Sequence, residues 1–195
     1  MIYFTSDWHF CHDKAFLWGP RGFKNQWEMN EAIITKHNNI VTNDDDVYCL
    51  GDCILTDNEE GLKCIKQLNG KIHIIRGNHD SDTRMELYNN CYNIVSTSEG
   101  EFLRYGKYHF YLSHFPCLTS NFDTDKLLKA RTLSLAGHSH YQNRFKDMDK
   151  GFIYHVECDA HRCMPVSIDE ILKDIKFFIS LDKNAQIELC KKDIY

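Results

Sequence analysis

The first half of the chain alternates short apolar runs with longer amphipathic segments. Three runs rich in β-forming residues have the length of buried strands, namely residues 1–6, 47–50 and 72–75. Residues 27–41 and 59–68 carry apolar residues at helical spacing, and Asn69-Gly70 ends the second of these helices. The order β-α-β-α-β predicts a parallel sheet with right-handed crossovers.

The second half is predicted to contain shorter and more closely spaced strands. A short helix at 82–89 precedes three segments separated by turns, at 93–97, 101–105 and 108–113. This spacing indicates hairpins and antiparallel pairing. Two further strands, at 133–136 and 152–157, and a helix at 166–179 complete the pattern, whereas 10–26 is expected to be a loop. No linker or internal repeat divides the chain, so we expect one α/β domain over residues 1–195.

A few types of polar side chain recur where the predicted strands end. In chain order these residues are Asp7, His9, Asp52, Asn78, His79, Asp80, His114, His138 and His140. Ligands of open α/β sheets bind beyond the carboxyl ends of the strands, so these side chains are expected to meet in one cleft. Residues two apart on an extended backbone point the same way, which suits the D-x-H and H-x-H pairs. Glycine before Asp52, Asn78 and His138 permits a sharp turn and a close approach.

Seven of these residues are potential metal ligands: Asp7, His9, Asp52, Asn78, His114, His138 and His140. Imidazole together with carboxylate suits Zn, Mn, Fe or Ni. One ion with about four to six ligands cannot use all seven and leave room for a substrate, whereas two ions sharing a carboxylate can. A single His or Gly-Asp pair after a strand is more often an ordinary surface residue or turn. The recurrence at five strand ends is what favours a two-metal centre.

Five blocks of residues resemble, in this order and without a substituted ligand, the signature of calcineurin-like metallophosphoesterases. They are Asp7-x-His9, Gly51-Asp52, Gly77-Asn78-His79-Asp80, His114 and Gly137-His138-x-His140. They span residues 7 to 140, and the first block, Asp7-x-His9-Phe10-x-His12, is similar to that of small bacterial and phage-type members. The resemblance implies a four-layer α/β/β/α sandwich of two mixed sheets. Cys11 stands where such relatives commonly have glycine, which concerns the backbone path beside the site and not the ligands.

The resemblance also implies a role for each site residue. The first divalent ion would be held by Asp7, His9, Asp52 and His140, and the second by Asp52, Asn78, His114 and His138. Asp52 would thus bridge the two, while His79 would be the catalytic histidine and Asp80 its orienting partner. Two ions about 3.5–4 Å apart lower the pKa of a bridging water, whose hydroxide would attack phosphorus as His79 protonates the leaving oxygen. The chain would then be a phosphodiesterase or phosphatase.

The segment that leaves the first predicted strand, residues 10–27, bears on the substrate. It interleaves aromatic with basic residues. The rings either cover the edge of the sheet or form a wall for the organic part of the ester, with His12 or Arg21 reaching a phosphate oxygen. We therefore expect a small or nucleotide-like phosphate ester as the substrate.

The composition of the chain bears on its partners and on its cellular compartment. The net charge of −5 argues against long nucleic acid as a partner, because such binding depends on Lys and Arg. A nuclease is the alternative enzyme, and a non-catalytic scaffold is the alternative from another class, although a scaffold should have lost ligands or His79. Nine cysteines without a C-x-x-C pair indicate buried thiols in a reducing compartment. With no signal peptide and no apolar run of roughly 20 residues, the sequence predicts a cytoplasmic protein without a membrane span. The oligomeric state stays open.

Overall fold

In a computed structural model that describes residues 1–119 and 132–192, the strands form two mixed sheets. The first has the order β4-β3-β2-β1-β9. Its strands are β1 (Ile2–Thr5), β2 (Asp46–Cys49), β3 (Lys71–Ile75), β4 (Ile94–Ser98) and β9 (Val166–Ser167). β1 to β4 run parallel and β9 is antiparallel to β1. The predicted parallel β-α-β-α-β arrangement is therefore confirmed.

The second sheet has the order β5-β6-β7-β8. Its strands are β5 (Glu101–Tyr105), β6 (Tyr108–Leu112), β7 (Thr132–Ala136) and β8 (Ile153–His155). β5 and β6 form the expected hairpin, whereas β6, β7 and β8 are parallel. The expectation that residues 93–97 join the antiparallel stretch is wrong. β4 pairs parallel with β3, because the helix before it provides a crossover and Asn93 binds the carbonyl oxygens of Ile65 and Leu68.

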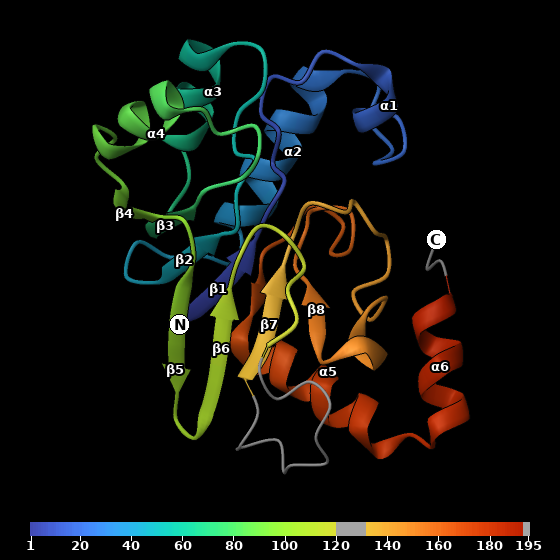
Figure 1. Ribbon diagram of the computed structural model, residues 1–195. Helices are drawn as coiled ribbons and strands as arrows, with labels where there is room; N and C mark the ends of the chain where they lie inside the picture. Colours follow the sequence, from blue (N-terminus) through green and yellow to red (C-terminus); the bar gives the residue numbers. More distant parts are fainter. Residues whose placement is uncertain (120–131, 193–195) are drawn as a thin grey trace.

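Three helices cover the outer face of the first sheet, α2 (Gln26–Asn38), α3 (Asn58–Ile65) and α4 (Asp82–Asn89) (Figure 1). Each begins at a polar cap: the side chains of Asn25, Asp57 and Ser81 accept hydrogen bonds from backbone N–H groups of the first turn. One face of the strands, including Val47 and Ile72, packs in a buried cluster with helix residues such as Met29 and Ile65.

The other face of the first sheet packs in a cluster with the second sheet. Phe4, Tyr48 and Ile75 belong to the same buried cluster as Phe110 and Leu133. Neighbouring strand residues thus face opposite layers, as the pleat of a strand requires. The two mixed sheets packed with helices form the predicted α/β architecture.

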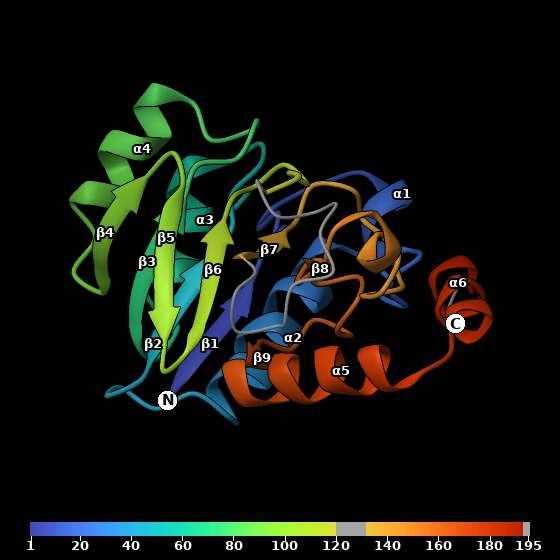
Figure 2. The same cartoon turned by 60° about the horizontal axis from the view of Figure 1, so that its bottom comes forward.

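Helix α5 (Ile168–Ser180) adds its apolar stripe to the cluster between the sheets and runs beside β9 (Figure 2). It starts with a capping box between Ser167 and Glu170. Val166, expected within this helix, lies in β9 instead, because its backbone pairs with Phe4. A helix α6 (Lys183–Lys191) and a 3₁₀ turn η2 (Met148–Lys150) follow no sequence prediction, and α1 (Ala15–Trp18) lies within the expected loop 10–26. Within the described segments, no helix has the length and apolarity to cross a membrane.

Candidate metal centre

The predicted site residues gather at one end of the two sheets. β1, β6, β7 and β8 all point toward this end in Figure 1. The segments after β1 and β2 are hydrogen-bonded to each other. The N–H of Asp7 donates to the carbonyl oxygen of Gly51 (2.9 Å), and the N–H of His9 donates to that of Asp52 (3.0 Å). The N–H of Cys158 donates to the carbonyl oxygen of Ser6 (3.1 Å), and this bond joins the segment after β8 to the end of β1. The structure thus brings these side chains together at the strand ends.

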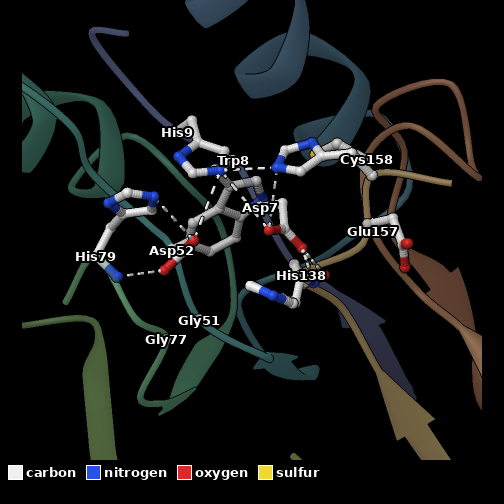
Figure 3. Close-up of polar contacts among 12 residues, drawn as sticks. Asp7, Trp8, His9, Gly51, Asp52, Gly77, His79, His138, Glu157 and Cys158 are labelled. Atoms are coloured by element: carbon white, nitrogen blue, oxygen red, sulfur yellow. Dashed lines mark hydrogen bonds and ion pairs between the residues drawn. The ribbon is translucent and has the colours of Figure 1, made fainter. Parts of the chain in front are cut away.

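A first group of candidate metal ligands consists of Asp7, His9 and His140. His9 Nε2 lies 3.2 Å from His140 Nε2, and each of the two nitrogens lies 3.6 Å from Asp7 Oδ1. His9 Nε2 is also 3.7 Å from Asp52 Oδ2. Figure 3 shows Asp7, His9, Asp52 and His79 pointing toward one another. These contacts comprise the four residues expected around the first ion.

A second group surrounds His114. Its Nε2 lies 2.9 Å from Asn78 Oδ1, 3.2 Å from His138 Nδ1 and 3.5 Å from Asp52 Oδ2. The opposite nitrogen, Nδ1, lies 2.7 Å from the carbonyl oxygen of Leu50, which fixes its proton there and leaves Nε2 with a lone pair. These are the four residues expected around the second ion.

Asp52 links the two groups. Its Oδ2 faces His9 on one side and His114 on the other, and Oδ1 accepts the N–H of His79 at 2.8 Å. Asp7 also lies within reach of both groups, because its carboxylate is close to Asp52 and His114 as well as to His9 and His140. Two buried carboxylates therefore lie at the centre of the imidazoles.

The backbone that presents these residues differs from the extended path expected for D-x-H and H-x-H. Asp7 and His9 have φ values of 57° and 48°, and His138 and His140 have 73° and 52°. Asp52 (55°) is also in the left-handed region. Non-glycine residues are uncommon there and concentrate at functional sites. Each pair reaches one centre because the chain coils tightly after the strand.

Two glycines permit the close packing that the sequence predicts. A Cβ on Gly77 would lie 2.2 Å from Asp52 Oδ1, and one on Gly137 would lie 2.5 Å from Asp7 Oδ2. Both distances are far below van der Waals contact. Glycine at these positions is therefore needed for the two central carboxylates to occupy their places.

The donor set fits divalent cations. Asp7 is fully buried, and its Oδ1 has no hydrogen-bond partner among the described residues. Burial alone would raise the pKa of Asp7, but His9 and His140 outweigh it and hold that pKa well below its ordinary value, so the carboxylate is charged. Burial lowers the pKa of His9 and, with His114 nearby, that of His138, which keeps both lone pairs available. A buried anionic oxygen without a hydrogen bond from any described residue lacks a partner, which a metal ion would supply.

His79 lies at the rim, where its ring is about half exposed and Nε2 is 3.9 Å from Asp52 Oδ2. Asp80 does not have the orienting role expected for it. Its carboxylate is buried and accepts hydrogen bonds from the N–H groups of Asp52 (2.7 Å), Cys53 (3.2 Å) and Gly77 (3.0 Å), and from the Tyr88 hydroxyl (2.8 Å). Asp80 thus holds the turns after β2 and β3 in register, while its backbone neighbour His79 is free to face the centre.

Arg21 is also placed differently from the expectation. Its side chain is 2% exposed and forms a two-pronged pair with Asp159, with Nη2–Oδ2 at 2.7 Å and Nε–Oδ1 at 3.1 Å. Asp159 in turn lies 2.9 Å from His140 Nδ1. Burial alone would raise the pKa of Asp159, but His140 and Arg21 together lower it to about 2. The sequence reasoning missed Asp159, although it follows the predicted strand 152–157 as the other site residues follow theirs.

His12 borders a hollow of about 480 Å³ beside the centre, which His9, His79 and His140 also line. Phe16, Leu17 and Leu55 make part of its wall apolar. The His12 ring meets the Phe16 ring edge-on at 5.2 Å, and its Nδ1 accepts the N–H of Lys14. Burial lowers the pKa of His12 to about 4, so the ring is neutral at pH 7. Of the aromatic segment 10–27, the part around Phe16 faces the centre.

Comparisons with known proteins show what this chain is similar to. The sequence profile of a family described as calcineurin-like phosphoesterase matches residues 1–188. An uncharacterized protein of Methanocaldococcus jannaschii is 32% identical over 90% of this chain and 91% of its own. A structure of a protein of unknown function from Aquifex aeolicus has a TM-score of 0.68 and 25% identity, over 90% of this chain and 99% of that one. A phosphoesterase from E. coli has a TM-score of 0.44 and 17% identity, over 80% and 77% of the respective chains.

Proposed function

Because the chain belongs to the calcineurin-like phosphoesterase family, we propose that it hydrolyses a phosphate ester with the help of two divalent metal ions. The observation that carries the proposal is the position of Asp52. Its Oδ2 lies 3.7 Å from His9 Nε2 and 3.5 Å from His114 Nε2, between two groups that each combine imidazole with carboxylate. Mn, Fe, Ni and Zn all suit these nitrogen and oxygen donors.

The residues divide the work. Asp7, His9, Asp52 and His140 would hold one ion, and Asp52, Asn78, His114 and His138 the other. When bound, such ions make a water nucleophilic near neutral pH and neutralise charge on the phosphoryl oxygens. His79, half exposed at the rim, donates a proton or hydrogen bond to the departing oxygen. Buried Asp80 keeps the Asp52 and Gly77 backbones in place during the reaction.

The hollow next to His79 and His140 supports a small or nucleotide-like ester as the substrate. Phe16 is 73% exposed although it stands beside His12 and the centre, so its ring is available to an organic group. An aromatic ring can stack on any nucleotide base, because every base has a flat face. The volume of the hollow, about 480 Å³, falls in the usual range for small-molecule sites. His12 then lies where its ring can contact a phosphate oxygen or the sugar.

The proposal is tested with the purified protein and a panel of phosphomonoesters, phosphodiesters, cyclic nucleotides and a short polynucleotide, each assayed with Mn, Ni, Mg and Zn. Asp52→Asn removes the charge that both groups share, and we expect turnover to fall on the order of 10³-fold, about 4 kcal/mol in transition-state stabilisation.

Asp46→Asn is the matched control, because Asp46 lies at the start of β2, the strand that leads to Asp52, and pairs with His73. It should retain activity. Two ions bound to the wild-type protein without turnover of any ester, or normal turnover by Asp52→Asn, would contradict the proposal.

A further inference from the structure

A buried arginine joins three segments around the first group of ligands. Arg21 comes from the loop after β1, yet its Nη2 donates to the carbonyl oxygen of Asp7 (2.8 Å) and its Nη1 to that of Trp8 (3.3 Å). The same guanidinium donates to both oxygens of Asp159, in the segment after β8. Since Asp7 and His9 hold a left-handed backbone, these two bonds fall on the strained turn that presents them.

Asp159 connects this arginine to a metal ligand. Its Oδ2 lies 2.9 Å from His140 Nδ1 and 2.7 Å from Arg21 Nη2. A carboxylate only accepts hydrogen bonds, so the nitrogen that faces it carries the proton. His140 Nε2 is then left with its lone pair, and it is this atom that lies 3.2 Å from His9 Nε2 and 3.6 Å from Asp7 Oδ1.

We propose that Arg21 and Asp159 are positioning residues that build the first metal site: Asp159 fixes the tautomer and direction of His140, and Arg21 holds both Asp159 and the Asp7–Trp8 turn. The proposal rests on the two-metal function proposed above. It gives Arg21 the role of positioning metal ligands, instead of the substrate contact expected from the sequence. The guanidinium and the carboxylate carry opposite charges, so the pair leaves the net charge of the ligand set unchanged.

The chemistry of Asp159 makes the role specific. Its two oxygens serve three donors, Nε and Nη2 of Arg21 and Nδ1 of His140. An amide of the same shape has one acceptor oxygen and turns an N–H₂ group toward a donor. Asp159→Asn therefore leaves the volume intact but loosens His140, and loss of such a carboxylate partner typically weakens metal affinity by about 10–100-fold.

The test measures metal binding to the wild-type and variant proteins by competition of Mn²⁺ and Zn²⁺ with a chelator of known affinity. We expect Asp159→Asn and Arg21→Lys to lower the affinity of one ion about 10–100-fold, with that of the other ion within about twofold. Nitrogen-15 NMR of the metal-free wild type at alkaline pH should show His140 protonated at Nδ1, and a mixture of tautomers in Asp159→Asn. Neither reading requires turnover, so they stay informative if the hydrolysis proposal fails.

Asp147→Asn is the matched control, because Asp147 forms an equivalent pair with His155, at 2.9 Å, outside the ligand groups. It should leave both metal affinities unchanged, and its unfolding measures what the loss of a buried pair does to the fold. Unchanged affinity in Asp159→Asn, an equal fall for both ions, or a raised KM with normal metal affinity in Arg21→Lys would overturn the assignment.

Discussion

At the scale of single residues, a variant of His79 can distinguish metal binding from the hydrolysis step. His79 follows the proposed ligand Asn78, its backbone N–H donates to Asp52, and its ring stands half exposed at the rim. We expect His79→Asn to keep both metal ions and to lose about 10²–10⁴-fold in kcat with alkyl phosphate esters, whose leaving oxygen needs a proton. With a nitrophenyl ester, whose leaving group departs without protonation, the loss should be much smaller. Steady-state kinetics on both esters, with metal analysis of each preparation, check this.

The control for His79 is the neighbouring His12, which lines the same hollow but lies outside both ligand groups. His12→Asn should change KM more than kcat and should not depend on the leaving group. An equal loss of rate for both esters in His79→Asn would rule out the proton-donor role.

At this scale the sequence predicted identities better than roles. The seven proposed ligands and His79 stand out in the sequence because Asp, His and Asn side chains suit such ions and recur at the strand ends. Arg21 and Asp80 stood out too, but their side chains serve the backbone of the site, and only the folded chain shows that. A charged residue near a cleft reads alike in the sequence whether it turns toward solvent or inward.

Among the elements, the turns after β2 and β3 depend on each other. Gly77 follows β3, and a Cβ there would lie 2.4 Å from the backbone nitrogen of Asp52 and 2.2 Å from its Oδ1. We expect Gly77→Ala to fold with its strands intact but to push these turns apart and weaken binding of both ions at least tenfold, since Asp52 belongs to both groups. Chelator competition measures the affinity, and circular dichroism checks the fold.

Gly106→Ala is the companion variant. Gly106 has a φ of 57° in the β5–β6 turn, and a Cβ there meets no atom within 4 Å. It should cost about 1 kcal/mol of stability through backbone strain alone and leave metal binding as it was. If Gly77→Ala bound both ions normally, close packing of the two turns would not be a requirement of the site.

The elements with strong periodicity could be predicted, and the weak ones could not. Runs such as 47–50 have one side toward the helices and the other toward the second sheet, so they are apolar throughout and read as buried strands. The partner of residues 94–98 was not readable, since pairing depends on which edge the preceding helix reaches. Helix α1 spans one turn and α6 lies at the periphery, where few buried residues leave a pattern.

For the whole molecule, a buried cluster links stability to pH. His155 is fully buried, with Nε2 2.9 Å from Asp147 and Nδ1 3.2 Å from Glu157. Burial alone would lower the pKa of His155, but the two carboxylates raise it to about 9. A raised histidine pKa stabilises the fold fully below the unfolded pKa of about 6.5, and this stabilisation is lost as the pH rises through about 9.

We therefore expect the free energy of unfolding to fall between pH 6.5 and 9 by a few kcal/mol, on the order of 3. His155→Gln should lower stability at pH 6 and flatten this alkaline slope. Urea unfolding at pH 6, 7.5 and 9 measures both. His73→Gln, which alters a partly exposed histidine paired with Asp46, should keep the slope of the wild type. A wild-type slope in His155→Gln would assign the alkaline loss to other groups.

The overall architecture followed from the sequence because the order of strands and helices restricts the possible topologies. The presence of two sheets was implied by the family resemblance alone, since the chain crosses from the first to the second at residues 99–100 with little signal of its own. The buried His155 cluster was not foreseen, because a histidine inside a strand reads as a core residue until its partners from distant segments are known.

The left-handed backbone at Asp7, His9, Asp52, His138 and His140 has a consequence for the evolution of the chain. Glycine suits this conformation better than the residues present, and β-branched residues suit it worst. Selection for a stable fold alone would therefore drift these positions toward glycine and leave the strands before them untouched. Aspartate and histidine persist there only while their chemistry is under selection, so a lineage that abandoned the proposed reaction would record the loss first at these five positions.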